Sequence, residues 1–347
     1  MTIAFNQVAV IGAGAMGRGI AQIAAQAGSQ VWLYDTQADA IQKAKEAVFQ
    51  VWDTLATKGR LDADTVNAYK SRLHSANALS DLKSCEMVVE AIVERLDIKK
   101  SLFVELENLL PETAILVTNT SSLSVTAIAA ALKRPANFAG YHFFNPVPLM
   151  KVVEVIAGLK TSPSVCERLT AFATQMGHTP VQANDTPGFI VNHAGRGYGT
   201  EALRIVSEGV ADFATIDRIL KDQVGFKLGP FELFDLTALD VSHPVMESIY
   251  NQYYQEPRYR PSVITAQRLA GGVVGKKVGE GFYTYVDGKA VLPPEPPVPD
   301  VKEFPPVWVS PRASRRLELL QLLKDLGATI ETGASPSPQA LTLVAPL

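Results

Sequence analysis

Cysteine, charge and long apolar runs are all scarce in this sequence, and each shortage excludes a class of protein. The chain has 347 residues but only two cysteines, which cannot hold together a disulfide scaffold of this size. Charged residues make up 19%, below the ~25% usual for soluble domains. The 47% of hydrophobic residues excludes a disordered chain, because burying them can offset the entropy cost of ordering.

An excess of basic charge is missing as well. The 32 basic and 35 acidic side chains give a net charge of -3, so we expect no nucleic-acid partner. No stretch approaches the ~18 uninterrupted apolar residues of a membrane span, and the N-terminus lacks the charged segment and cleavage site of a signal peptide. We therefore expect a cytoplasmic, globular protein with no membrane partner.

The first 185 residues predict an α/β domain. Short apolar runs alternate with helical patterns, which favours a mostly parallel sheet covered by helices. The segment between the second and third strands reads as two helices broken at Lys58 and Gly59, because glycine commonly follows a helix end. We expect these helices to project from the sheet as a hairpin. The predicted strands are residues 8–11, 31–34, 87–91, 115–118, 138–142, 152–156 and 179–182.

The rest of the chain divides into three segments. Strand signals stop after residue 185, and residues 186–286 predict an all-α second domain. Seven of the fourteen residues from 293 to 306 are proline, which favours a semi-rigid linker over residues 287–306. Residues 307–347 predict an incomplete α/β extension. Its expected elements are strands at 307–309 and 341–344 and a helix at 311–326.

A glycine-rich turn follows the first predicted strand. Gly12 permits the tight turn, Gly14 lets the backbone approach a pyrophosphate, and Gly17 lets helix and strand pack closely. The helix that begins near Ala15 and Met16 presents unpaired N–H groups and the positive end of its dipole to the phosphates. Such a turn can also occur without a ligand. Here strand, glycines, helix and second strand follow in order, which predicts a Rossmann-type dinucleotide site.

Asp35 ends the second predicted strand, 18 residues beyond Gly17. At this position a carboxylate can hydrogen-bond the ribose hydroxyls of an adenosine. The same carboxylate would repel a 2′-phosphate, and Thr36 and Gln37 offer no arginine to receive one, so the sequence favours NAD over NADP. Asp35 can also cap the helix that follows, a role compatible with the first.

Five histidines are candidates for proton chemistry, and His142 differs from the others in its surroundings. It ends an apolar strand, and ligands of open α/β sheets collect at the carboxyl ends of strands. A histidine in such an aromatic-rich strand is also common as a core residue. The other four are better explained as surface, capping or packing residues, or as neighbours of the site: His74, His178, His193 and His243.

Glu154 makes a catalytic role for His142 more attractive. It lies within an apolar strand, where a charge is costly to bury unless it is paired. If the two strands form a hairpin centred near Pro148, residues 142 and 154 lie opposite each other. A carboxylate that holds an imidazole in one tautomer makes it a competent general base. The alternative is an unrelated glutamate on an edge strand.

Together these motifs resemble the L-3-hydroxyacyl-CoA dehydrogenase family. The resemblance covers about residues 5–286, in the family's order and near its spacing. The matching motifs are GAGAMG at 12–17, VVEA at 88–91, NTSSL at 119–123, HFFNP at 142–146, TPGFIVN at 186–192, GPFEL at 229–233, and GKK and GFY between 275 and 283.

The resemblance implies NAD-linked oxidation of an (S)-3-hydroxyacyl-CoA to the 3-ketoacyl-CoA. It makes His142 the base, with Glu154 as the partner that orients it. Ser121 and Asn192 would bind the substrate near its reacting oxygen. Besides the glycine-rich turn, the residues that it places in the NAD site are Asp35, Glu94, Lys99, Ser121 and Asn145.

Binding of coenzyme A and assembly are also implied by the resemblance. The helical hairpin would help to hold coenzyme A, with Lys58 and Arg60 as phosphate contacts. Dimerisation would use the helical domain, and no metal is expected. The runs at 240–244 and 256–262 look more like bacterial enzymes of aromatic-acid (phenylacetate) degradation, which act on 3-hydroxyadipyl-CoA or similar substrates. Those enzymes continue into a second helical module, so residues 307–347 resemble the beginning of their extension.

Two rival functions remain open at this point. A crystallin-type relative would bind NAD without turnover, although Ser121, His142, Glu154 and Asn192 are all present. A β-hydroxyacid dehydrogenase acting on free acids would normally need a catalytic lysine or arginine in the second domain.

Overall fold

The computed structural model describes residues 4–295, 297 and 304–344. The chain forms two compact units, residues 1–292 and 293–347, and each is treated by itself. Much of the predicted proline linker, residues 296 and 298–303, lies outside the described residues. No helix in the described part of the chain is long and apolar enough to cross a membrane.

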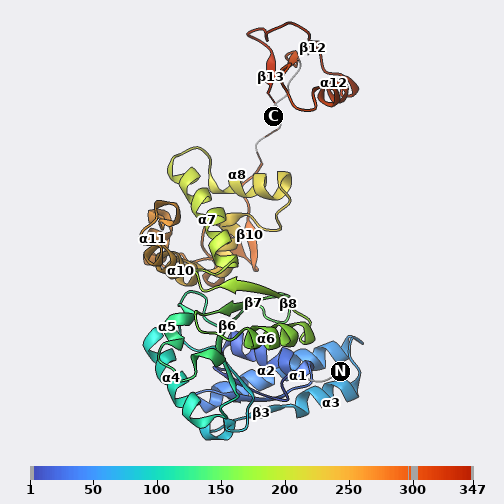
Figure 1. Cartoon of the computed structure of the whole chain (residues 1–347). Helices are drawn as coiled ribbons and strands as arrows, with labels where there is room; N and C mark the ends of the chain where they lie inside the picture. Colours follow the sequence, from blue (N-terminus) through green and yellow to red (C-terminus); the bar gives the residue numbers. More distant parts are fainter. Residues whose placement is uncertain (1–3, 296, 298–303, 345–347) are drawn as a thin grey trace. The chain divides into compact units, whose positions relative to one another are not determined.

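An eight-stranded sheet forms the centre of the first unit (Figure 1). Its strand order is β3-β2-β1-β4-β5-β6-β7-β8, and all neighbouring pairs are parallel except β6 and β7. The first six strands therefore have the order of a Rossmann fold, as the sequence predicted. The strands are β1 (Gln7–Ile11), β2 (Gln30–Tyr34), β3 (Leu73–Ser75), β4 (Met87–Glu90), β5 (Ile115–Thr118), β6 (Phe138–Phe143), β7 (Val152–Ala157) and β8 (Thr179–Asn184).

Helices cover both faces of this sheet, and each face has its own apolar core (Figure 1). One core joins the strands to α1 (Ala15–Gln26), α2 (Ala38–Thr57), α3 (Ala63–Ser71) and α6 (Pro163–Gln175). The other joins them to α4 (Leu96–Leu109) and α5 (Val125–Ala129). Alternate residues of a strand point to opposite faces, so Val8 and Val10 enter the first core and Ala9 the second. This packing fixes the strand ends that carry the site.

The predicted helical hairpin is formed by α2 and α3. Gly59 lies just past α2 with φ +67°, a conformation that glycine adopts at little cost. Asp62 caps α3 by accepting a hydrogen bond from the Thr65 backbone N–H at 2.7 Å. The short strand β3 that follows was not predicted, because its three residues form too short an apolar run to recognise.

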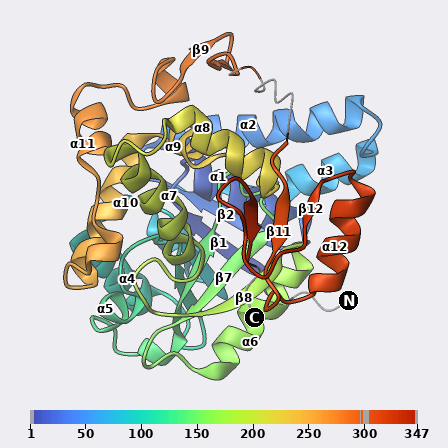
Figure 2. The same cartoon turned by 90° about the horizontal axis from the view of Figure 1, so that it is seen from above.

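The second part of the first unit is mainly helical (Figure 2). Its helices are α7 (Val191–Ser207), α8 (Phe213–Arg218), the π-helix η3 (Ile219–Gln223), α9 (Pro230–Thr237), α10 (Leu239–Gln252), η4 (Pro257–Tyr259), α11 (Val263–Ala270) and η5 (Lys276–Val278). A hairpin of β9 (Thr284–Val286) and β10 (Lys289–Val291) ends the unit. The prediction of a purely α-helical segment missed this hairpin, and β10 lies within the range 287–306 assigned to a linker.

The second unit is a three-stranded parallel sheet with one helix. Its elements are β11 (Val307–Val309), α12 (Arg316–Asp325), β12 (Ile330–Glu331) and β13 (Leu341–Leu343), with β11 in the centre of the sheet. The predicted helix at 311–326 began five residues too early, and β12 was missed. No residue of α12 is buried, and Leu317 is 79% exposed, so this unit leaves apolar surface uncovered.

Candidate active site

The glycine-rich turn between β1 and α1 has the geometry that its glycines require. Gly12 has φ +103°, and a Cβ built there would lie 2.4 Å from the Ala91 carbonyl oxygen. A Cβ on Gly17 would lie 1.8 Å from the carbonyl oxygen of Gly12. Gly14 differs, since no described atom lies within 4 Å of such a Cβ. The turn is thus packed tightly against the protein at Gly12 and Gly17, and it is open at Gly14, where a pyrophosphate would approach.

The edge of this turn suits an adenosine dinucleotide. Asp35 accepts a hydrogen bond from the Ala13 N–H at 2.8 Å, which places its carboxylate beside the turn. No side chain caps the start of α1, because the residue just before the helix is Gly14. A pocket of about 510 Å³ adjoins the carboxylate, with an apolar wall that includes Ile92 and Leu102. An open turn, an uncapped helix and a carboxylate beside a partly apolar pocket together fit the phosphates, ribose and adenine of NAD.

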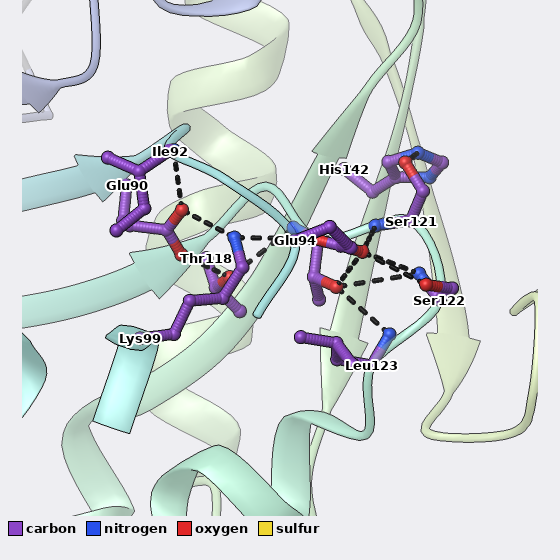
Figure 3. A network of polar contacts seen from close by, with 10 residues as sticks. Glu90, Ile92, Glu94, Lys99, Thr118, Ser121, Ser122, Leu123 and His142 are labelled. Atoms are coloured by element: carbon purple, nitrogen blue, oxygen red, sulfur yellow. Dashed lines mark hydrogen bonds and ion pairs between the residues drawn. The ribbon is translucent and has the colours of Figure 1, made fainter. Parts of the chain in front are cut away.

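A buried ion pair anchors the next strand end (Figure 3). Glu90, at the end of β4, and Lys99, on α4, are 0% and 1% exposed, and their charged atoms lie 2.5 Å apart. Glu90 also accepts hydrogen bonds from the Ile92 N–H and the Thr118 hydroxyl, both at 2.7 Å. Both charged groups of this buried pair therefore have partners. Without such partners a buried ion pair would destabilise the fold.

Glu94 extends this network to the loop after β5 (Figure 3). Its carboxylate accepts hydrogen bonds from the hydroxyl of Thr120 at 2.5 Å and from the N–H groups of Ser121 at 2.9 Å and Ser122 at 3.0 Å. Burial works to raise the pKa of Glu94, but the charge of Lys99 and these hydrogen bonds hold it below its usual value. An ionised Glu94 therefore fixes the position of Ser121.

His142 lies between a carboxylate and a hydroxyl. Its Nδ1 is 2.6 Å from Oε2 of Glu154, and its Nε2 is 3.0 Å from the hydroxyl of Ser121. The antiparallel pairing of β6 and β7 sets residue 142 opposite residue 154, the register that the sequence predicted. His142 is 3% exposed, and the rings of Phe144 and Phe189 pack against its imidazole. Their ring centroids lie 4.6 and 5.7 Å from the imidazole centroid.

The second carboxylate oxygen of Glu154 holds the start of the helical part. Oε1 accepts hydrogen bonds from the N–H groups of Ile190 at 2.8 Å and Val191 at 2.9 Å. These residues begin α7, and the next one is Asn192, whose side-chain amide faces the Ser121 carbonyl oxygen at 3.4 Å. Glu154, 0% exposed, is therefore fully paired and brings Ser121, His142 and Asn192 together.

Comparisons with known proteins agree with this geometry. Residues 7–186 match the family profile "3-hydroxyacyl-CoA dehydrogenase, NAD binding domain", and residues 188–285 match "3-hydroxyacyl-CoA dehydrogenase, C-terminal domain". The chain belongs to the 3-hydroxyacyl-CoA dehydrogenase family. Both the family and the NAD-binding domain were predicted from the sequence, and both predictions are confirmed.

The individual relatives differ in length. The chain is 44% identical over 285 residues to the 3-hydroxyadipyl-CoA dehydrogenase of Escherichia coli K12, a match that covers 82% of this chain and only 60% of that relative. It is 41% identical over 276 residues to a probable 3-hydroxybutyryl-CoA dehydrogenase of Deinococcus radiodurans, covering 80% of this chain and 99% of the relative.

One solved structure also matches the second unit. The crystal structure of 3-hydroxybutyryl-CoA dehydrogenase from Escherichia coli K12 has a TM-score of 0.81 and 35% identity. The match covers 97% of this chain and 80% of that chain. Coverage of 97% leaves too few residues unmatched to omit the second unit, so part of this dehydrogenase beyond residue 292 has a counterpart there.

Among the described residues, the remaining predicted site residues make no hydrogen bond to the His142 ring. Asn145 follows β6 and is exposed. Lys58 and Arg60 are exposed in the turn of the helical hairpin. Lys58 lines an open pocket of about 450 Å³ on α2, together with Phe49.

Sequence reasoning missed several residues that position the site. Thr118 donates a hydrogen bond to the buried Glu90, and Thr120 donates one to Glu94. Gln252 on α10 donates a hydrogen bond to the Ser122 carbonyl oxygen at 2.7 Å. Thr120 and Ser121 were visible as part of the NTSSL motif. Nothing in the sequence indicates that Gln252 contacts Ser122, because the two residues are 130 positions apart. Such contacts depend on how the helical part packs on the sheet.

Proposed function

We propose that this dehydrogenase oxidises an (S)-3-hydroxyacyl-CoA to the 3-ketoacyl-CoA and that His142 is the general base. The observation that carries the proposal is a row of three hydrogen-bonded side chains at the carboxyl edge of the sheet. The Ser121 hydroxyl is 3.0 Å from Nε2 of His142, and Nδ1 of His142 is 2.6 Å from Oε2 of Glu154. A buried histidine that only fills a core has no need of a carboxylate on one nitrogen and a partly exposed hydroxyl on the other.

Glu154 determines which nitrogen of His142 takes up the proton. An ionised carboxylate only accepts hydrogen bonds, so Nδ1 carries the hydrogen and donates it to Glu154. Nε2 then carries the lone pair, which faces the Ser121 hydroxyl, and accepts the C3 hydroxyl proton of the substrate. The negative charge of Glu154 stabilises the imidazolium that results.

Ser121 and Asn192 hold the reacting oxygen beside Nε2 of His142. The Ser121 hydroxyl already lies within hydrogen-bond distance of Nε2, and Asn192 reaches the same loop from the other side. NAD, when bound, supplies the acceptor for the hydride from C3. The packed rings of Phe144 and Phe189 keep water from the imidazole, which strengthens the electrostatic interactions around it.

The NAD site is formed by the glycine-rich turn and the strand ends beside it. The backbone of Ala15 and Met16 at the start of α1 would face the pyrophosphate, between Gly12, Gly14 and Gly17. Asp35 would bind the adenosine ribose. Glu94, Ser121 and Asn145 would line the nicotinamide side. Lys99, being 1% exposed, acts through Glu94.

Coenzyme A would lie along the helical hairpin. The pocket on α2 combines an aromatic ring, Phe49, with the cation of Lys58 at its edge. An aromatic face suits adenine, and an exposed lysine suits a phosphate.

The finer proposals concern pathway and assembly. The similarity to a 3-hydroxyadipyl-CoA dehydrogenase favours aromatic-acid (phenylacetate) degradation over general fatty-acid oxidation. A homodimer through the helical part is supported by exposed apolar side chains within residues 219–241. They include Ile219, Val224, Phe226, Leu236 and Val241, each at least 49% exposed.

The test of the proposed function is the substitution His142→Gln. We expect it to lower kcat for a 3-hydroxyacyl-CoA by about 10²- to 10⁴-fold, the usual contribution of a general base. NAD affinity should not change, because the glycine-rich turn is untouched. NADH absorbance measures the first quantity and calorimetric titration with NAD the second. His74→Gln, a matched change in β3, is the control.

The same assay separates the rival functions. Full activity in the His142→Gln variant would remove this residue from the mechanism. NAD binding without any NADH formation by the unaltered protein would favour a non-catalytic relative. Turnover of the free 3-hydroxy acid, but not of its coenzyme A thioester, would favour a β-hydroxyacid dehydrogenase.

A further inference from the structure

Arg196 lies on α7 one helical turn beyond Asn192. Residues four apart share a face of a helix, so Arg196 is on the side of α7 that carries Asn192. Its Nε donates a hydrogen bond to the Asn192 backbone carbonyl oxygen at 3.0 Å. The side chain is therefore folded back toward the start of the helix, where Ser121 and His142 lie.

The charge of Arg196 has no anionic partner among the residues that the structure describes. The side chain is half-buried, and burial alone lowers the pKa of its guanidinium, with no neighbouring carboxylate to oppose the effect. Arg204, farther along the same helix, is instead exposed and paired with Glu208 at 3.1 Å. A partly desolvated, unpaired cation is costly, which points to a ligand that supplies the missing negative charge.

The residues next to Arg196 on α7 are two glycines, and a polar histidine lies one turn away. Its chain neighbours, Gly195 and Gly197, have no side chains that could cover it, and a Cβ on either would meet no described atom within 4 Å. His193, three residues before it, lies between two tyrosine hydroxyls. Its Nδ1 is 3.0 Å from Tyr253 and its Nε2 is 3.4 Å from Tyr259. A purely apolar acyl tail would gain little from contact with these polar groups.

We propose that Arg196 binds the terminal carboxylate of a short dicarboxylic 3-hydroxyacyl-CoA and is a specificity-determining residue of this enzyme. The inference rests on the proposed function, because it takes Asn192 as a marker of the reacting carbon. The guanidinium lies beside Asn192, because its Nε is 3.0 Å from the Asn192 backbone carbonyl oxygen. Three carbon–carbon bonds of about 1.5 Å each separate C3 from the carboxylate in a six-carbon acid, so the guanidinium is within reach.

Two other arginines are less suited to this role. Arg258 and Arg260 flank Tyr259, and both are exposed. An exposed arginine interacts with a carboxylate in high dielectric, where such a pair contributes little. Arg196 has the partly buried position in which a charge pair with the ligand would discriminate between substrates.

The experiment compares two six-carbon substrates that differ only at the far end, 3-hydroxyadipyl-CoA and 3-hydroxyhexanoyl-CoA. The unaltered enzyme should have the higher kcat/KM for the dicarboxylic substrate. In Arg196→Met, the ratio of the two kcat/KM values should fall by about 10- to 100-fold, the usual effect of losing a hydrogen-bonded charge pair. The change should come mainly from KM for 3-hydroxyadipyl-CoA, and Arg196→Lys should retain part of the ratio.

Arg204→Met is the matched control, since it removes an arginine from the same helix at an exposed position. Its substrate ratio should equal that of the unaltered enzyme. An equal loss for both substrates in Arg196→Met would overturn the proposal and make Arg196 a support for Asn192. An unchanged ratio would overturn it as well. In both cases the dehydrogenase function would stand, whereas an unaltered enzyme inactive on both substrates would contradict the function itself.

A measurement without any substitution also tests the proposal. The unaltered enzyme should prefer the six-carbon dicarboxylic substrate to a dicarboxylic substrate two carbons longer, because the hydrogen bond from Nε holds the cation beside Asn192. No preference for the acid-terminated over the methyl-terminated six-carbon chain would overturn the proposal, whatever the behaviour of the variants.

Discussion

Glu154 shows, at the scale of a single residue, how much a charge in an apolar strand reveals. Its position between Val153 and Val155 required a partner, and the hairpin geometry supplied His142 as that partner. The hydrogen bonds to the N–H groups of Ile190 and Val191 could not be predicted in the same way. They join segments 36 and 37 residues apart, whose proximity depends on tertiary packing.

The substitution Glu154→Gln tests this residue. The amide oxygen of a glutamine can still accept the hydrogen bonds from Ile190 and Val191, but its NH₂ group would donate to His142 and stabilise the wrong tautomer. We expect kcat to fall by about 10³- to 10⁴-fold, by analogy with loss of the orienting carboxylate in a serine protease. The pH profile of kcat should change shape, which a purely structural loss would not cause.

Glu107→Gln is the matched control for this prediction. Glu107 is also a buried glutamate, and it accepts hydrogen bonds from the N–H groups of Lys133 and Arg134 at 2.8 and 2.6 Å. Its substitution should lower the melting temperature without changing the pH profile. Similar pH profiles for the two variants would show that Glu154 only stabilises the fold.

At the scale of an element, α7 contains several weak helix formers, although its first turn carries the proposed site residue Asn192. Gly195, Gly197 and Gly199 each lower its intrinsic stability by about 1 kcal/mol relative to alanine. Only Gly199 has a packing reason, because a Cβ there would lie 2.6 Å from Cζ of Phe234. The helix forms nonetheless, because Glu154 holds its start and the buried Ala202 and Leu203 hold its centre.

The three glycines should therefore respond differently to alanine. Gly195→Ala and Gly197→Ala should each raise the free energy of unfolding by about 0.5–1 kcal/mol, since the added methyl group meets open space. Gly199→Ala should lower it by about 1–3 kcal/mol through overpacking against Phe234. Urea denaturation measures all three, and a destabilised Gly195→Ala variant would contradict this reading of α7.

At the scale of the whole molecule, every proposed site residue lies in the first unit. The site residues run from Gly12 to Arg196, and the apolar side chains proposed for dimerisation lie within residues 219–241. Residues 293–347 form their own compact unit with a separate small sheet. This unit carries none of the proposed chemistry.

A chain ending at Leu292 tests this division. We expect it to keep kcat and KM within about twofold and to keep the oligomeric state of the full chain, because its two apolar cores and its helical part are complete. NADH formation and light scattering after size-exclusion chromatography measure the two quantities. Loss of turnover in a chain that still binds NAD would mean that the second unit takes part in catalysis.

The sequence by itself determined the Rossmann strands other than β3, the glycine-rich turn and the pairing of His142 with Glu154. These features follow from local periodicity, from the steric demands of glycine and from a short hairpin. Only the tertiary structure decided that Glu154 also holds α7, that Gln252 reaches Ser122, and that Arg196 lies beside Asn192 with no carboxylate partner among the described residues. The reason is physical: such contacts depend on how the helical part packs on the sheet, and no local pattern records that packing.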